Sequence, residues 1–143
     1  MSDLLVVPGW LGPNRMFNPK QGQSYVFGVF TVTPQRLSYA AADGTVVFDV
    51  APSDATIEWP WWLLGGSRVR VPAGTWILTF GRPFPDAPIP DRDSVHRATT
   101  ALEQIHQRPA ADLVHALVPH DPDLSDAKIG RKVGAQVKAA LTA

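Results

Sequence analysis

Between Ser24 and Phe80, apolar and polar residues alternate along the chain, which is the period of a β-strand that buries one face. The alternation is clear in Val46–Val50 and again in Trp76–Phe80, and Asp43-Gly44 before the first of these is a strong hairpin signal. The pattern predicts about seven strands joined mostly by short links. Such a chain is typical of an antiparallel meander.

Two further features refine the expected sheet. Leu4–Val7 is expected to be a short additional strand, because its apolar run stops at Pro8. Gly28 lies within a β-branched and aromatic stretch, so we expect a bulge or a sharp bend there. Alternation also predicts a shared core face made of five large apolar residues, namely Trp59, Trp76, Phe48, Leu78 and Phe80.

The periodicity changes after the proline-rich segment 81–90. Apolar residues then recur at spacings of three and four over Val95–Ile105, which predicts a helix that plugs the barrel, with Leu102 buried. A short helix is expected from Pro109 to Leu117, and Ser125 caps a last helix. We therefore expect an α+β fold, mainly antiparallel β, with 1–118 as a barrel with its capping helices. Residues 119–143 then form a basic amphipathic helix, in the same domain or as a short appendage.

This order of elements resembles the pleckstrin-homology-like superfold. The residues that carry the resemblance are Gly28-Val29-Phe30-Thr31-Val32-Thr33, Arg36-Leu37-Ser38-Tyr39 and Asp43-Gly44, which are similar to bacterial pleckstrin-homology-like and GRAM-like domains. The resemblance implies a barrel of about seven strands in two nearly orthogonal sheets, plugged at one end by a C-terminal helix, with an additional terminal helix here. It also implies a role in binding or scaffolding.

One feature of phosphoinositide-binding members can be compared directly. Those members carry a lysine followed by an alternating basic pair on the hairpin that opens the fold. Lys20 matches the lysine, but the next two positions are Gln23 and Tyr25, which are not basic. The sequence therefore argues against binding of polyphosphoinositides.

Composition narrows the classes of function. The 13 basic and 13 acidic residues cancel, so charge gives no reason to expect a nucleic-acid partner. The chain has no cysteine, which removes disulfides, thiolate metal sites and cysteine nucleophiles. No run approaches the roughly 18 apolar residues of a membrane span, and the N-terminus lacks the basic lead of a targeting signal. We expect a cytoplasmic protein, peripheral to the membrane at most.

The loop that contains Trp61, Trp62, Leu63 and Leu64 departs from the strand alternation on either side of it. One interpretation is that this apolar run folds over the mouth of the barrel and buries itself. The other is that it is exposed and contacts a partner or a lipid surface. Arg68 and Arg70 on the next strand are expected to lie beside it, either as part of this binding site or as an ordinary solvated strand face.

Catalytic and metal-binding patterns are not found. The histidines His96, His106, His115 and His120 have no i, i+4 spacing, so we expect no metal site and no cofactor. There is no nucleophile elbow, phosphate loop or dinucleotide fingerprint, and we assign no catalytic residue. An active site assembled only in space is not excluded by these patterns.

The last helix carries four basic residues around an apolar line of Ile129, Val133, Val137 and Leu141. The basic residues are Lys128, Arg131, Lys132 and Lys138. Such a helix either lies on an anionic membrane or packs its narrow apolar stripe on the barrel or on a second copy.

These observations favour a non-catalytic module that recognises a protein partner, by self-association or otherwise, or an amphiphile, through the Trp61–Leu64 loop. Two alternatives remain at this stage. One is a small enzyme on an α+β barrel, and the other is a purely structural subunit of an oligomer.

Overall fold

The computed structural model describes residues 4–13, 25–60, 66–80, 91–117 and 127–142. Within these residues the chain is an α+β fold with seven strands and three α-helices. The strands are β1 (Leu5–Pro13), β2 (Val26–Val32), β3 (Leu37–Ala41), β4 (Val46–Val50), β5 (Thr56–Glu58), β6 (Ser67–Val71) and β7 (Gly74–Thr79). The helices are α1 (Arg92–His106), α2 (Ala110–Ala116) and α3 (Ala127–Thr142), and a short 3₁₀ helix, η2 (Pro52–Asp54), joins β4 to β5.

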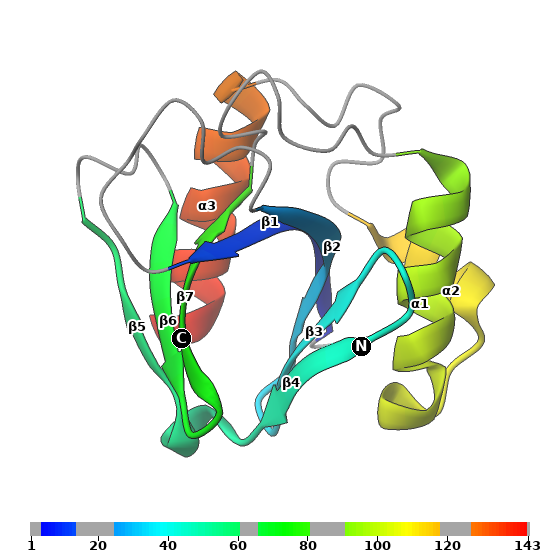
Figure 1. Ribbon diagram of the computed structural model, residues 1–143, viewed down its shortest axis with the longest axis horizontal. Coiled ribbons are helices and arrows are strands. Elements are labelled where there is room, and N and C mark those ends of the chain that lie inside the picture. The colour runs from blue at the N-terminus through cyan, green and yellow to red at the C-terminus, as the bar shows by residue number, and fades with distance from the viewer. Residues whose placement is uncertain (1–3, 14–24, 61–65, 81–90, 118–126, 143) are drawn as a thin grey trace.

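The strands form one antiparallel sheet in the order β4-β3-β2-β1-β7-β6-β5. β1 is central, because its first part pairs with β2 and its last part, Trp10–Pro13, pairs with β7. Figure 1 shows the result as two wings, β2–β3–β4 and β5–β6–β7, with β1 crossing between them. β4 and β5 lie at opposite ends of the order, so the sheet is not closed into the expected barrel.

The sequence indicated only the first part of β1. The structure extends this strand from Leu5 to Pro13, through residues that normally break strands. Pro8 is tolerated because it precedes the segment in which β1 has neighbours on both sides. Because this segment contains two prolines and two glycines, the sequence pattern did not predict the full strand that joins the two wings.

The centre of the sheet is built on two glycines and a tyrosine. Gly9 of β1 lies opposite Gly28 of β2, and the ring of Tyr39 on β3 covers both. The buried Tyr39 hydroxyl lies 3.0 Å from the carbonyl oxygens of Gly9 and of Val26, so its one proton is shared between two strands. Gly28 makes room for this ring and keeps regular pairing, and the register shift occurs in the β3–β4 pair instead.

Two apolar clusters lie on the two faces of the sheet. The inner cluster fills the space between the wings and is made of Val7, Leu11, Phe30, Val32, Leu37, Tyr39, Ala41, Phe48, Val69, Val71, Leu78, Phe80, Val133 and Val137. The outer cluster lies on the other face and is made of Val6, Trp10, Tyr25, Phe27, Val29, Ala40, Ile77, Val95, Ala98, Leu102, Leu113 and Leu117. The predicted grouping of Phe48, Leu78 and Phe80 is confirmed, with Trp59 and Trp76 packed at the margin of the inner cluster.

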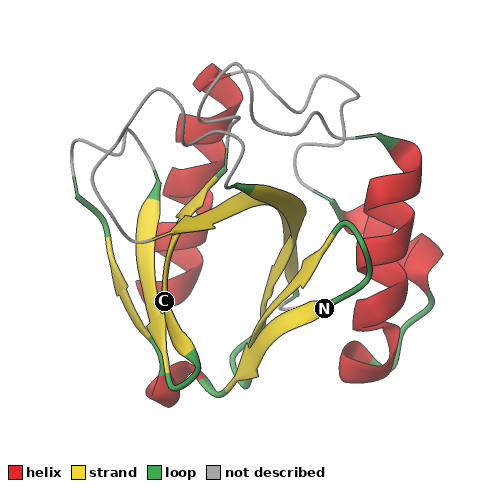
Figure 2. Ribbon diagram, in the orientation of Figure 1, coloured by secondary structure: helices red, strands yellow, loops and turns green. Residues whose placement is uncertain are grey.

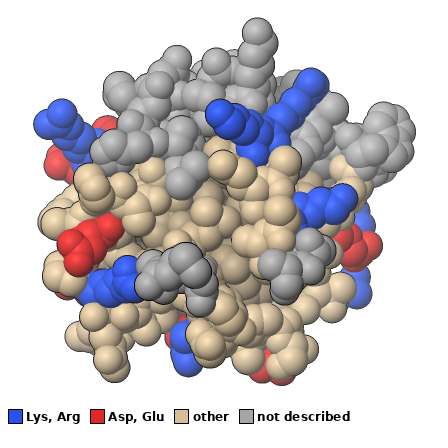
Figure 3. Space-filling view, turned by 180° about the vertical axis from the view of Figure 1, so that it is seen from behind, with Lys and Arg blue, Asp and Glu red and all other residues tan. Residues whose placement is uncertain are grey.

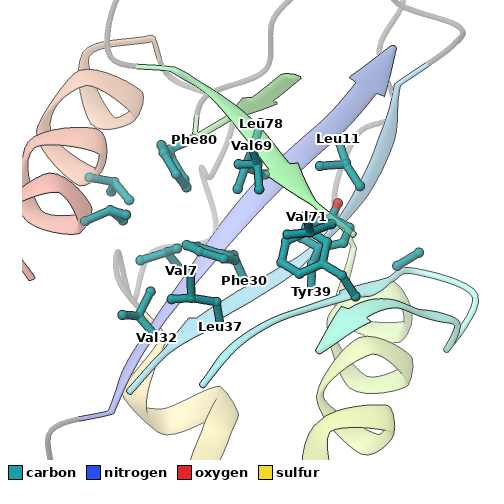
Figure 4. Packing of buried hydrophobic residues seen from close by; sticks show 14 residues of the cluster. Val7, Leu11, Phe30, Val32, Leu37, Tyr39, Val69, Val71, Leu78 and Phe80 are labelled. Atoms are coloured by element: carbon teal, nitrogen blue, oxygen red, sulfur yellow. The ribbon is translucent and has the colours of Figure 1, made fainter. Parts of the chain in front are cut away.

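The predicted position of the first helix is wrong. The Val95–Ile105 stripe packs on the outer cluster, with Val6 and Phe27, and not on the core face that contains Phe48. The helix that contacts the inner cluster is α3, through Val133 and Val137, and Figure 4 shows it beside Phe80. An amphipathic stripe indicates that a helix has a buried face, but it does not indicate which face of a sheet it covers. Figure 2 shows α1 and α2 outside the β2–β3–β4 wing.

Aromatic side chains connect the wings where no backbone pairing does. Phe48 on β4 stacks with Trp76 on β7, with ring centroids 6.1 Å apart. Phe30 on β2 likewise lies 6.2 Å from Phe80, which follows β7. Aromatic pairs of this kind contribute about 0.5–1.5 kcal/mol each beyond their buried area. The inner cluster thus holds the open sheet together by side-chain packing.

Replacing Leu102 with alanine tests the packing of α1. Leu102 is fully buried in the outer cluster, so L102A should lower the free energy of unfolding by about 2–5 kcal/mol. The control is T100A on the exposed face of the same helix, which should change stability little. Urea unfolding measures both. Equal stability of L102A and wild type would show that α1 does not pack there.

Candidate binding site at the sheet edge

The two predicted arginines lie on the β5–β6 hairpin, at the edge of the sheet. β5 pairs only with β6 among the described strands, and the register places Thr56 opposite Arg70 and Glu58 opposite Arg68. Both arginines alternate with inward-facing valines, so they project from the outer side of the hairpin. The hairpin therefore presents its charged side chains on the face away from the inner cluster.

Glu58 lies between the two arginines. Its carboxylate oxygens are 3.8 Å from Arg68 and 3.7 Å from Arg70, and the Arg70 side chain is the more exposed, at 60% against 28%. Exposed ion pairs at this separation contribute at most about 1 kcal/mol. Two guanidinium groups thus lie on either side of one carboxylate on the outer side of the hairpin.

Trp59 directly follows β5 and points to the other face. Its ring stacks on Phe80, with centroids 6.2 Å apart and an interplanar angle of 27°, and it stays partly exposed at the margin of the inner cluster. Arg68, opposite Glu58, is therefore the arginine nearer Trp59, on the other face of the hairpin, whereas Arg70 lies further along β6, opposite Thr56. The structure brings Arg68 and Arg70 together, whereas the predicted Trp61, Trp62, Leu63 and Leu64 lie outside the described residues.

A polar cluster that the sequence did not reveal lies where α1 ends beside the outer face of the sheet. His106 Nε2 is 2.8 Å from the hydroxyl of the buried Thr31 on β2. Nearby, Asp49 on β4 accepts hydrogen bonds from Ser38 at 2.7 Å and from both ends of the Arg36 guanidinium at 2.7–2.8 Å. Thr31 and His106 are 75 residues apart, so no local spacing indicates their contact.

The cluster has a structural role. Thr31 and Ser38 are fully buried, so neither hydroxyl is accessible to a substrate. Hydrogen bonds from Arg36 hold the pKa of Asp49 below its ordinary value, which keeps the carboxylate ionised. Burial lowers the pKa of His106, although the negative charge of Asp49 opposes this shift. Together these contacts tie the C-terminal turn of α1 to β2, β3 and β4.

The remaining predictions concern metal binding, the other histidines and membrane spans. In the part of the chain that the structure describes, no three His, Asp or Glu side chains form a group able to hold a metal ion. His96 and His115 are exposed, and His120 lies beyond the described ranges. None of the described helices has the length and apolar character needed to cross a membrane.

The pKa of His106 gives a testable pH dependence. Because the folded protein holds this pKa below the ordinary 6.5, the unfolded chain binds the proton more readily. Stability is therefore full above about pH 6.5 and decreases as the pH falls below it. H106Q should weaken this decrease between about pH 7.5 and pH 5.5, whereas H96Q, at an exposed site, should retain it. Melting temperatures measured across this range would contradict the assignment if H106Q and wild type had the same slope.

Comparison with known proteins identified no relative of this chain. No protein-family model, no curated protein and no solved structure matches the chain. The resemblance to pleckstrin-homology-like domains therefore stays a prediction.

Proposed function

We propose that the chain is a non-catalytic binding module that contacts a protein partner through the end of the β5–β6 hairpin. The proposed contact surface consists of the Trp61–Leu64 loop, with Arg68 next along β6 and Arg70 at the outer margin of the surface. The observation that carries the proposal is the position of this hairpin. It forms one edge of an open sheet, with a partly exposed Trp59 on one face and two arginines sharing Glu58 on the other.

The energetics favour this end of the hairpin. Moving a large apolar side chain out of water contributes about 1.5–3 kcal/mol, so two tryptophans and two leucines provide a substantial apolar term against the cost of association. Tryptophan and arginine are also the residues most enriched at interface hot spots. The exposed guanidinium group of Arg70 favours a partner that places a carboxylate there.

The fold supports a pleckstrin-homology-like module as the wider class. Two antiparallel wings that share a central strand, with a C-terminal helix packed on the cluster between them, fit the arrangement that the resemblance implies. In this proposal α3 takes the role of the plugging helix, and α1 and α2 are additions to the outer face.

The double variant W61S/W62S tests the proposed surface. If the loop is an interface, the variant keeps the wild-type melting temperature, because the replaced side chains contact a partner and not the core. Self-association of the chain, measured by sedimentation velocity over a concentration series, should be lost in the variant. R70Q should weaken the same association less, because one exposed charge contributes about 1 kcal/mol or less.

The matched control replaces an aromatic residue that belongs to the core. W10S removes a fully buried tryptophan of the outer cluster and should lower the melting temperature strongly. A comparable decrease in W61S/W62S would show that the loop is core and would overturn the proposed surface. Self-association of the variant as strong as that of the wild type would overturn it as well.

A further inference from the structure

The charges of the chain are unevenly distributed, although they sum to zero. The segment of α3, Ala127–Thr142, contains four lysine or arginine residues and no aspartate or glutamate. The rest of the chain therefore holds nine basic and 13 acidic residues, a net charge of −4. One helix thus carries a positive charge that the rest of the molecule balances.

The apolar face of α3 is already occupied. Val133 and Val137 are 1% and 0% exposed and belong to the inner cluster. A helix that inserts into a bilayer must present its apolar face to the lipid. Because this face packs on the sheet, α3 can contact another body only through its polar face.

The polar face presents its cations to solvent. Arg131, Lys132 and Lys138 are exposed, and neither Arg131 nor Lys132 forms an ion pair with a described residue. At about 100° per residue, Arg131 and Lys138 lie on one line two turns apart, and Lys132 lies about 100° around the helix. Figure 3 views the molecule from behind, with one group of basic side chains at the upper centre and other basic side chains at the margins beside acidic ones.

The helix surface between these cations carries short side chains. The exposed Ala135 and Ala139 lie between the line of Arg131 and Lys138 and the position of Lys132. Recognition of one carboxylate or phosphate requires donors that converge on a point. Here the charges are spread over two turns on both sides of an alanine surface, which matches a continuous anionic plane better than a single anionic group.

We propose that the exposed face of α3 docks the protein on an anionic phospholipid surface by electrostatic attraction, without insertion. The lipid phosphates and carboxylates pair with Arg131, Lys132 and Lys138. The negative charge of the rest of the chain is repelled by the same surface, so the molecule is oriented with α3 toward the lipid. Each basic residue near such a surface strengthens binding by about fivefold, so the contact is reversible and weakens with salt.

Co-sedimentation with phospholipid vesicles tests this proposal. Vesicles of phosphatidylcholine with about one third phosphatidylserine should bind the full chain, and vesicles of phosphatidylcholine alone should not. Removing two cations in R131Q/K132Q should weaken binding by about 25-fold. The matched control, R92Q/R108Q, removes two exposed cations at the ends of α1 and makes the same change in net charge. It should bind nearly as well as wild type.

The outcomes separate this proposal from the interface on the β5–β6 hairpin. W61S/W62S should keep vesicle binding, so loss of binding in that variant but not in R131Q/K132Q would assign the lipid contact to the loop and overturn the proposal. Equal losses in R131Q/K132Q and R92Q/R108Q would show attraction to net charge alone, which also overturns it. Binding of heparin without any binding of phosphatidylserine vesicles would assign the surface to a soluble polyanion. Equal melting temperatures of the variants would show that each is folded.

Discussion

The packing of Tyr39 against Gly9 and Gly28 is the contact on which the rest of the structure depends. Without a Cβ on either glycine, the tyrosine ring lies directly against the paired backbones of β1 and β2, and its hydroxyl bonds to both strands. Burial raises the pKa of this hydroxyl well above 10, so it remains a proton donor at any physiological pH. The contact holds the junction at which β1 leaves β2 and continues to β7. The separation of the sheet into two wings begins at this junction.

The two proposed surfaces follow from this arrangement. Because the sheet stays open, β5 is an edge strand, and its hairpin presents Trp59 and Arg70 on opposite faces. Because the space between the wings must be covered, α3 packs Val133 and Val137 there and turns its basic side outward. The same packing that completes the core therefore determines which side of the terminal helix is available to a partner. A fold with a closed barrel would present neither surface in this form.

Sequence reasoning succeeded where local pattern determines structure. Alternation grouped Phe48, Leu78 and Phe80 correctly, and the predicted tight turn holds a glycine with positive φ, Gly44. It failed where the answer depends on distant segments. The central part of β1 is rich in glycine and proline, and only its neighbours β2 and β7 and the covering rings make it a strand. The side of the sheet that α1 covers, and the contact of His106 with Thr31, likewise depend on tertiary packing.

The free energy of unfolding of G28A tests the role of the tyrosine–glycine contact most directly. The sign of the change distinguishes a close contact, which the substitution destabilises, from an ordinary strand position, which it stabilises. At an ordinary strand position, replacing glycine with alanine stabilises a protein by about 0.4–1 kcal/mol. Here the added Cβ would meet the carbonyl oxygen of Ala40 and lie 2.7 Å from the Tyr39 hydroxyl. We expect a loss of about 1–3 kcal/mol or more, as for an overpacked core. A variant as stable as wild type, or more stable, would contradict the account.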